Sequence, residues 1–504
     1  MQRLQAAILK DTDCKVRGKS GLGPRVLSRG CWNALSPFCS FGLNELKRRT
    51  GARRWRLLAK TGRCNLADHL AERLAFALEP TVKVISNAEV VLWDDGSSGP
   101  RKKSDRELSR IFSGALMSFP SLAELISLVL TDWIVAQHEL LSRVESDSRY
   151  LEQFLAASMP IGRIERLQPG LSDPHRFGRT VTKIEFRNGR KIIYRPRACT
   201  GEKLWSQIIA WLNGAGFMPV LRTQSILSRN TYSWTHFLST RPCRSLAEIR
   251  HFYIRWGAQS ALARIFGLAD LHQENWVAAG SHPILLDVEM FGRDASKLQR
   301  VDLNVPSLHP LLATGLLPFR QRNGSRYRGA APFDLAESFS SKPRCWPRYR
   351  QKSYGPADFS TEILYGFASM IEFIWGQTAR IKQTRSFLKR SDSMKRRVLI
   401  RSTQEYWSLL GESLRPQFMF SLKSRYPLLF RSCRSGAPSR KLAAAEARSL
   451  VRCSIPHFFV SPKRLRARMP TEGEMWGSYS LLQRQLATLF GTKGLPEWIR
   501  ARIS

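Results

Sequence analysis

The chain has 504 residues, of which 80 are lysine or arginine and 40 are aspartate or glutamate, so its formal net charge is +40. A hydrophobic fraction of 43% is enough for a folded core and excludes an intrinsically disordered protein. The positive charge attracts polyanions such as nucleic acid, acidic peptides, nucleotide phosphates or an anionic membrane surface, but does not choose between them.

The chain order predicts a helical preface, a small β-rich lobe and a large α-rich lobe. Residues 1–105 form a basic, weakly defined region, and a helical stretch continues to about residue 158. The predicted β-rich lobe covers about 160–245, and the helical lobe covers about 246–504. The segment 121–136 is the most apolar one, but it is too short to span a bilayer, so we expect no transmembrane segment.

The β-rich lobe begins with a strong hairpin signal. The alternating stretch TVTKIEF (180–186) and the stretch KIIYRPR (191–197) flank an Asn-Gly turn. An amphipathic helix over 201–217 follows, and glycines mark its end. The nine cysteines are scattered without a CxxC pair, and no apolar signal peptide is visible, so we expect a soluble protein of the reducing cytoplasm.

Acidic and amide side chains interrupt an apolar run at 268–292. A polar loop, DLHQEN, follows a long helix, and two short apolar strands flank a Gly-Ser-His turn. A hairpin of these strands would bring Asn275 and Asp287 together, and their oxygens suit Mg²⁺ that also takes phosphate oxygens. Asp270 stands where a base could accept a hydroxyl proton. This order of base, Asn and Asp follows the logic of protein kinases.

Each of these residues also has a plainer interpretation. An Asp can cap a helix, and a His can be a satisfied core residue; it is the ordered set that favours a catalytic site. A second polar stretch, SDPHRFGRTV (172–181), contains Asp173, His175 and Gly178 directly before the hairpin. Taken alone, it is more typical of an Asx-turn with a solvated histidine.

Together these stretches resemble the N-terminal dehydratase domain of class II (LanM-type) lanthipeptide synthetases. The resemblance covers about residues 110–490. It rests on the order and spacing of SDPHRFGRTV, KIIYRPR, AWLNGAGF, DLHQEN, ILLDVE and ATGLLP, with a weaker similarity at IPHFF (455–459).

The resemblance implies an α+β protein with a kinase-like, more narrowly lipid-kinase-like, two-lobed core. The implied enzyme phosphorylates Ser/Thr of a precursor peptide with ATP and Mg²⁺, then eliminates phosphate to leave dehydroamino acids. By matching position, Asp270, His272, Asn275 and Asp287 belong to phosphorylation, with Asn275 and Asp287 nearest the metal. Asp173, His175 and Arg431 belong to elimination.

The chain departs from the family pattern at several positions. Arg195 replaces a lysine that handles ATP phosphates, and Arg is bulkier and forked, so the change is not conservative. Cys433 stands at a threonine position, and an upstream arginine is displaced to Arg425 or lost. No cyclase domain is expected in this chain, so a separate cyclase is a possible partner.

Three functions therefore remain open. The first is a standalone peptide dehydratase. The second is a peptide kinase that lacks elimination, and the third is a catalytically impaired homologue that binds a peptide through its basic surface. We expect a precursor peptide, with a leader and a Ser/Thr-rich core, as partner, and no specific nucleic acid.

Overall fold

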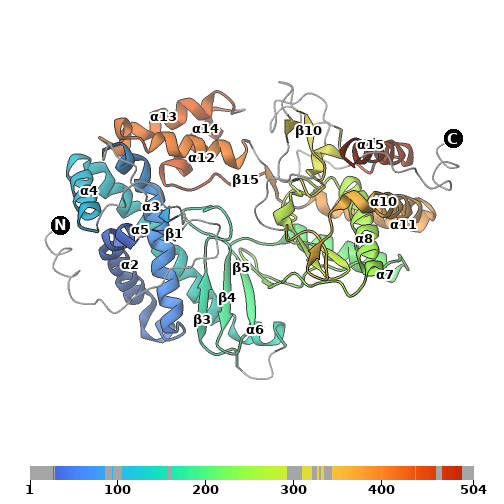
Figure 1. The fold of residues 1–504 in the computed structure, drawn as a ribbon, viewed down its shortest axis with the longest axis horizontal. Helices are drawn as coiled ribbons and strands as arrows, with labels where there is room; N and C mark the ends of the chain where they lie inside the picture. Colours follow the sequence, from blue (N-terminus) through green and yellow to red (C-terminus); the bar gives the residue numbers. More distant parts are fainter. Residues whose placement is uncertain are drawn as a thin grey trace. The chain divides into compact units, whose positions relative to one another are not determined.

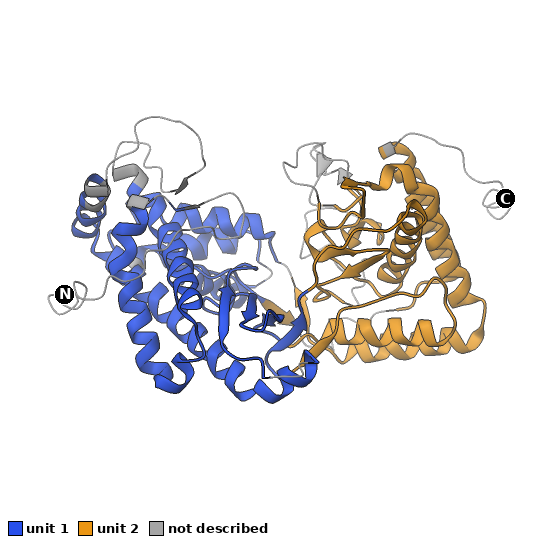
Figure 2. Ribbon diagram, turned by 60° about the horizontal axis from the view of Figure 1, so that its bottom comes forward, with its two compact units in different colours: residues 1–197, 229–237, 400–457 blue, residues 198–228, 238–399, 458–504 orange. Residues whose placement is uncertain are grey.

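The computed structural model describes residues 26–27, 29–85, 93–94, 105–156, 160–291, 309–320, 326–327, 331–333, 343–398, 400–437, 439–460 and 468–490. The chain forms two compact units (Figure 2). Unit 1 contains residues 1–197, 229–237 and 400–457; unit 2 contains residues 198–228, 238–399 and 458–504.

Helices make up the N-terminal part of unit 1 (Figure 1). The predicted helical stretch before residue 158 is confirmed, and two further long helices lie in the region that we expected to be weakly defined. Their apolar faces pack against one another, as in α5, whose buried positions recur every three to four residues. The helices are α2 (Arg29–Trp55), α3 (Lys60–Ile85), α4 (Asp105–Ser118), α5 (Pro120–Ser146) and α6 (Ser148–Phe154).

An antiparallel sheet follows in unit 1. The predicted hairpin is confirmed: β4 alternates buried and half-buried residues and pairs with β5, and Gly189 has φ +78° in the turn between them. Strand β3 flanks β4 and packs on α3, and β7 flanks β5. The strands are β3 (Ile164–Gln168), β4 (Thr182–Phe186), β5 (Lys191–Arg195) and β7 (Ser233–His236).

Three more helices, α12 (Thr403–Ser413), α13 (Leu422–Arg434) and α14 (Arg440–Val451), complete unit 1. Arg425 of α13 is fully buried and donates to the carbonyls of Ser413, Leu450 and Val451. These carbonyls end α12 and α14, where the helix dipoles favour a cation. The guanidinium therefore ties three helices together.

Unit 2 is built around two helices that cross at glycines. An ideal Cβ on Gly257 would lie 2.0 Å from Ile363 O, and one on Gly366 would lie 1.9 Å from Ile254 O. Only glycine permits this approach of the two backbones, because any side chain would overlap the facing carbonyl. The helices are α8 (Leu246–Ile265), which begins at the side-chain cap of Ser245, and α10 (Ser360–Trp375).

Unit 2 also contains further helices and short strands, several of which pack on this helix pair. Trp256 of α8 packs on Trp276 of a hairpin with a ring-centroid distance of 5.5 Å, which anchors that hairpin in the core. The elements are α7 (Thr200–Gly214), β6 (Ile226–Ser228), β8 (Trp276–Ala279), β9 (His282–Leu285), β10 (Phe319–Arg320), β11 (Arg326–Tyr327), β12 (Arg348–Tyr349), β13 (Lys352–Ser353), α11 (Thr378–Asp392), β14 (Arg396–Val398), β15 (Phe458–Val460) and α15 (Glu472–Phe490).

The division into units differs from the predicted domain boundaries. We predicted a break near residue 105 and a β-rich lobe over 160–245, but the N-terminal helices pack on β3, and 400–457 returns to the same unit. Residues 198–228, which we placed in the β-rich lobe, belong to unit 2. Contacts between segments far apart in the chain decide this grouping. The hydrophobic pattern within one segment does not predict such contacts.

Within the described residues, no single helix is long and apolar enough to cross a membrane. Residues Arg110–Ser118 together with α5 reach that length and apolarity only across a bend of 105°.

We expect Gly366→Ala to lower the free energy of unfolding of unit 2 by about 3 kcal/mol or more, because the new methyl group would force two packed backbones apart. The matched control is Gly477→Ala in α15 of the same unit, where no atom lies within 4 Å. There alanine should be neutral or stabilising by up to about 1 kcal/mol. Chemical denaturation of both variants measures the difference, and equal stability would show that the crossing tolerates a side chain.

Candidate functional site

The loop that carries Asp270 follows α8 and is held on both sides by backbone hydrogen bonds. Asp270 itself has φ +63°, a left-handed conformation that costs about 1 kcal/mol or more for a residue with a side chain. Ala269 N donates to Met290 O at 3.1 Å, and Leu271 N donates to Thr314 O at 2.9 Å. The ATGLLP segment thus supports the loop, and the surrounding structure keeps Asp270 in a strained conformation.

The predicted hairpin is confirmed and brings Asn275 beside Asp287. Strands β8 and β9 pair antiparallel with Trp276 opposite Leu285. One step further, Leu286 N donates to Asn275 O at 2.8 Å. The side-chain amide of Asn275 donates to Asp270 O at 2.7 Å, and this orients its Oδ1 away from that carbonyl.

The strand end at Asp287 is supported by the start of α7. An ideal Cβ on Gly201 would lie 1.9 Å from Val288 O, so the helix backbone contacts the strand backbone directly. The buried Glu202 accepts a hydrogen bond from Val288 N at 3.3 Å. These contacts fix the residue next to Asp287.

Several carboxylates gather around Asp270. Burial raises its pKa; His272 and Arg397 oppose the increase, and Asp287 and Glu289 add to it. Arg397 of β14 pairs with Glu289 at 2.7 Å, and both side chains are largely buried. Nε2 of His272 lies 3.9 Å from Asp270 Oδ1. The loop therefore carries more negative than positive charge.

This donor set fits a hard divalent cation. Asn275 and Asp287 offer one amide oxygen and one carboxylate, and Mg²⁺ commonly takes one or two carboxylates plus water and substrate phosphates. Burial is the main cause of the raised pKa of Asp270, and added positive charge would offset the smaller contributions of Asp287 and Glu289. Asn275 and Asp287 thus lie at the same end of the β8–β9 hairpin, and their role as metal ligands stays a prediction.

The second set of predicted residues lies in unit 1, on the turn between β3 and β4. Asp173 Oδ1 accepts from Trp407 Nε1 at 3.0 Å. Nδ1 of His175 lies 2.9 Å from Ile455 O. Because a carbonyl only accepts, this contact favours the tautomer with the proton on Nδ1 and the basic lone pair on Nε2.

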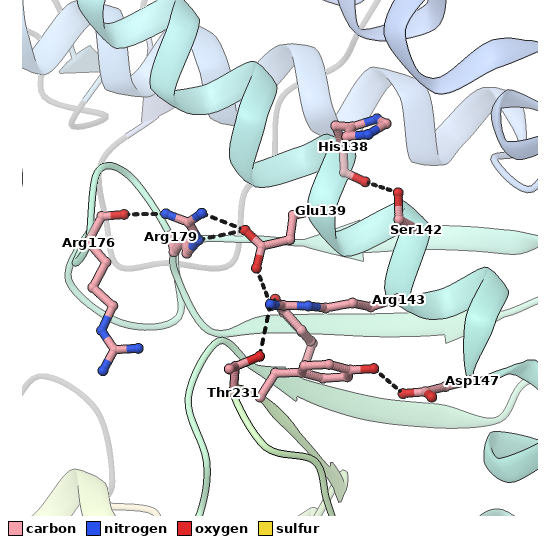
Figure 3. Close-up of polar contacts among 10 residues, drawn as sticks. His138, Glu139, Ser142, Arg143, Asp147, Arg176, Arg179 and Thr231 are labelled. Carbon is pink, nitrogen blue, oxygen red and sulfur yellow. Dashed lines mark hydrogen bonds and ion pairs between the residues drawn. The ribbon is translucent and has the colours of Figure 1, made fainter.

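A network of charged groups holds the backbone of this turn (Figure 3). Residues 176–178 all have positive φ, and Arg179 donates to Arg176 O at 2.5 Å. Arg179 also pairs with Glu139 of α5 at 2.6 Å, and Glu139 pairs in turn with Arg143. The turn conformation therefore depends on an acidic side chain from a helix.

The other predicted residues lie on other elements of the fold. Arg431 lies exposed on α13, with no side-chain hydrogen bond or ion pair to another described residue. Cys433 is fully buried, and burial raises its thiol pKa to about 12. Arg195 is buried at the end of β5 in unit 1, whereas Asn275 and Asp287 belong to unit 2.

The sequence reasoning missed several side chains that the structure places at these sites. Arg397, Trp407 and Glu202 carry no motif, and only their tertiary contacts reveal them. His457 stacks on His175 at a centroid distance of 4.6 Å. It belongs to the IPHFF stretch, whose weak similarity was a usable signal.

Two comparisons with known proteins indicate the family of this chain. The family described as "Domain of unknown function (DUF4135)" matches residues 119–339 and 331–461, which is more than half of the chain. The chain belongs to this family, which is found in LanM-type lanthipeptide synthetases, so the resemblance read from the motifs is confirmed.

A particular relative agrees with this class. The chain is 24% identical over 283 residues to the "Lacticin 481/lactococcin biosynthesis protein LcnDR2" of Lactococcus lactis subsp. lactis. The match covers 48% of this chain and 30% of that protein, so the chain corresponds to less than a third of its relative's length.

We expect Gly201→Ala to weaken Mg²⁺-ATP binding by about tenfold or more, because the methyl group would displace Val288 and with it Asp287. The matched control is Gly214→Ala at the other end of α7, where no atom lies within 4 Å. Titration calorimetry measures both variants. Wild-type affinity in Gly201→Ala would show that the helix start does not position the candidate metal ligands.

Proposed function

We propose that this chain acts in lanthipeptide biosynthesis as a peptide dehydratase that phosphorylates Ser/Thr side chains and then eliminates phosphate. The observation that carries the proposal is the juxtaposition of Asn275 and Asp287 with the Asp270 loop, in a chain of the DUF4135 family. The order of base, Asn and Asp along a loop and hairpin supports a kinase-like core.

In the phosphorylation step, Asp270 accepts the proton of the attacking hydroxyl. Its left-handed backbone and its bonded neighbours hold the carboxylate in place. Asn275 and Asp287 are the residues that would hold Mg²⁺. When bound, the cation would offset the charge of the triphosphate that supplies the phosphoryl group. The role of Arg195 at the ATP phosphates stays a prediction.

In the elimination step, His175 Nε2 removes the α-proton of the phosphorylated residue. The carbonyl of Ile455 stabilises the Nδ1 proton of His175 before and after transfer, since it accepts from either charge state. Asp173, held by Trp407, lies two residues before His175 on the same turn. The product is a dehydroalanine or dehydrobutyrine residue.

A peptide kinase without elimination is the second candidate. It is favoured by one observation: Arg425 is bound to helix-end carbonyls in the core and Cys433 is buried, so neither is available to a departing phosphate. Such a protein would accumulate stable phosphopeptide. A chain that binds the peptide but leaves its mass unchanged with Mg²⁺-ATP would instead be a binding module.

We expect Asp287→Asn to slow peptide phosphorylation by about 10²-fold or more, because the loss of a charged ligand removes several kcal/mol of stabilisation. The substrate is a Ser/Thr-containing precursor peptide, which a small Ser/Thr/Cys-rich reading frame beside the gene would identify. Mass spectrometry follows the gain of phosphate and the loss of water. The control Asp392→Asn removes a carboxylate that pairs with Arg396 on the same unit and should retain the wild-type rate. A wild-type rate in Asp287→Asn would contradict the metal assignment.

In the pH profile of the phosphorylation rate, the fall on the acid side (the acid limb) should occur at a higher pH than for an ordinary aspartate. The reason is that the pKa of Asp270 is raised and the base must be ionised. Arg397 lowers this pKa, so Arg397→Gln should move the limb to higher pH. Lys395→Gln removes a charge from an exposed position nearby and should leave the limb in place. A limb that stays fixed in Arg397→Gln would remove Asp270 from the role of base.

A further inference from the structure

The segment 453–457 packs directly on the turn that carries Asp173 and His175. Ile455 N donates to Pro174 O at 2.7 Å. The hydroxyl of Ser454 donates to the same carbonyl at 3.1 Å and accepts from Phe177 N at 3.1 Å. Together with the contact of His175 to Ile455 O, these bonds fasten two segments that are 280 residues apart.

This packing places the ring of His457 against the ring of His175. The centroids are 4.6 Å apart, and the ring planes are inclined by 27°. Both side chains are half-buried, so each keeps a surface that a substrate can reach. His457 is therefore a second imidazole at the candidate elimination site, from a different part of the chain.

Elimination needs a positive partner for the departing phosphate as well as a base. The arginines that support the turn are engaged elsewhere. The half-buried Arg73 donates to Gly178 O and Cys453 O, Arg179 pairs with Glu139, and Arg452 pairs with Asp132. Their contacts hold the backbone, and a further group is required at the phosphate.

We propose that His457 binds the departing phosphate in its protonated form while the neutral His175 acts as base. Of two stacked imidazoles, one tends to be protonated and the other neutral, because protonation of one ring disfavours protonation of the other. A neutral base beside a charged donor is the arrangement that elimination requires. This proposal rests on the elimination half of the proposed function.

The step balances without another reactant. His175 Nε2 takes the α-proton, and the electron pair of the Cα–H bond becomes the new double bond. The Cβ–O bond breaks, and its electrons leave with the phosphate. His457 donates a hydrogen bond to a phosphate oxygen and offsets the charge that develops there.

The test uses the full chain and a synthetic Ser/Thr-rich peptide that carries one phosphoserine, so that phosphorylation is bypassed. His457→Phe keeps a stacked ring without its charge and should slow phosphate release by about 10²-fold. His457→Lys keeps a charge without the ring and should retain more activity than His457→Phe. A role in stacking alone would reverse this order.

Inorganic phosphate provides a second measurement, because it should inhibit the wild-type chain more strongly than His457→Phe. The control is His251→Phe, an exposed histidine of unit 2, which should behave as wild type. If the wild type releases phosphate and His457→Phe matches it in rate and inhibition, the proposal for His457 is wrong and the dehydratase function stands. If the wild type releases none, elimination and the His457 role both fail, and the kinase alternative remains.

Discussion

The hydrogen bond from Leu286 N to Asn275 O is the interaction on which the candidate phosphorylation site depends. It continues the β8–β9 pairing by one step and makes neighbours of two oxygen-bearing side chains twelve residues apart. The core packing of Trp276 and the start of α7 fix the two ends of this hairpin. Because these contacts are made by backbone and buried rings, the ligand positions are determined before any cation binds.

The two candidate sites are built in the same way although they lie in different units. In each, a reactive side chain sits on or beside a left-handed turn: Asp270 itself has positive φ, and the three residues after His175 do. In each site, carbonyl groups from other segments accept hydrogen bonds. The carbonyls of Thr314 and Met290 hold the Asp270 loop, and the carbonyl of Ile455 contacts the ring of His175. A backbone with positive φ at residues that carry side chains is retained only where the surrounding contacts hold it in place. The hydrogen bonds to these carbonyls are therefore as important to each site as the reactive groups.

Part of the excess positive charge serves the fold. The buried Arg255 and Arg425 and the half-buried Arg73 donate to backbone carbonyls, and those that Arg425 contacts lie at the ends of helices. A guanidinium suits this role because its planar fork offers several donors and its charge favours helix C-termini. An arginine-rich composition is therefore compatible with internal bracing as well as with an acidic ligand, and composition alone does not separate the two.

The sequence by itself determined the local elements: the Asn-Gly hairpin, the paired strands after DLHQEN and the order of Asp270, Asn275 and Asp287, because turn chemistry and apolar alternation act over a few residues. The family similarity was also present in the motifs. Only the tertiary structure decided that 400–457 joins the N-terminal helices, that Arg397 faces Glu289 and that His457 stacks on His175. These contacts join residues one hundred or more positions apart, where no local pattern specifies the partner and the packing of whole elements does.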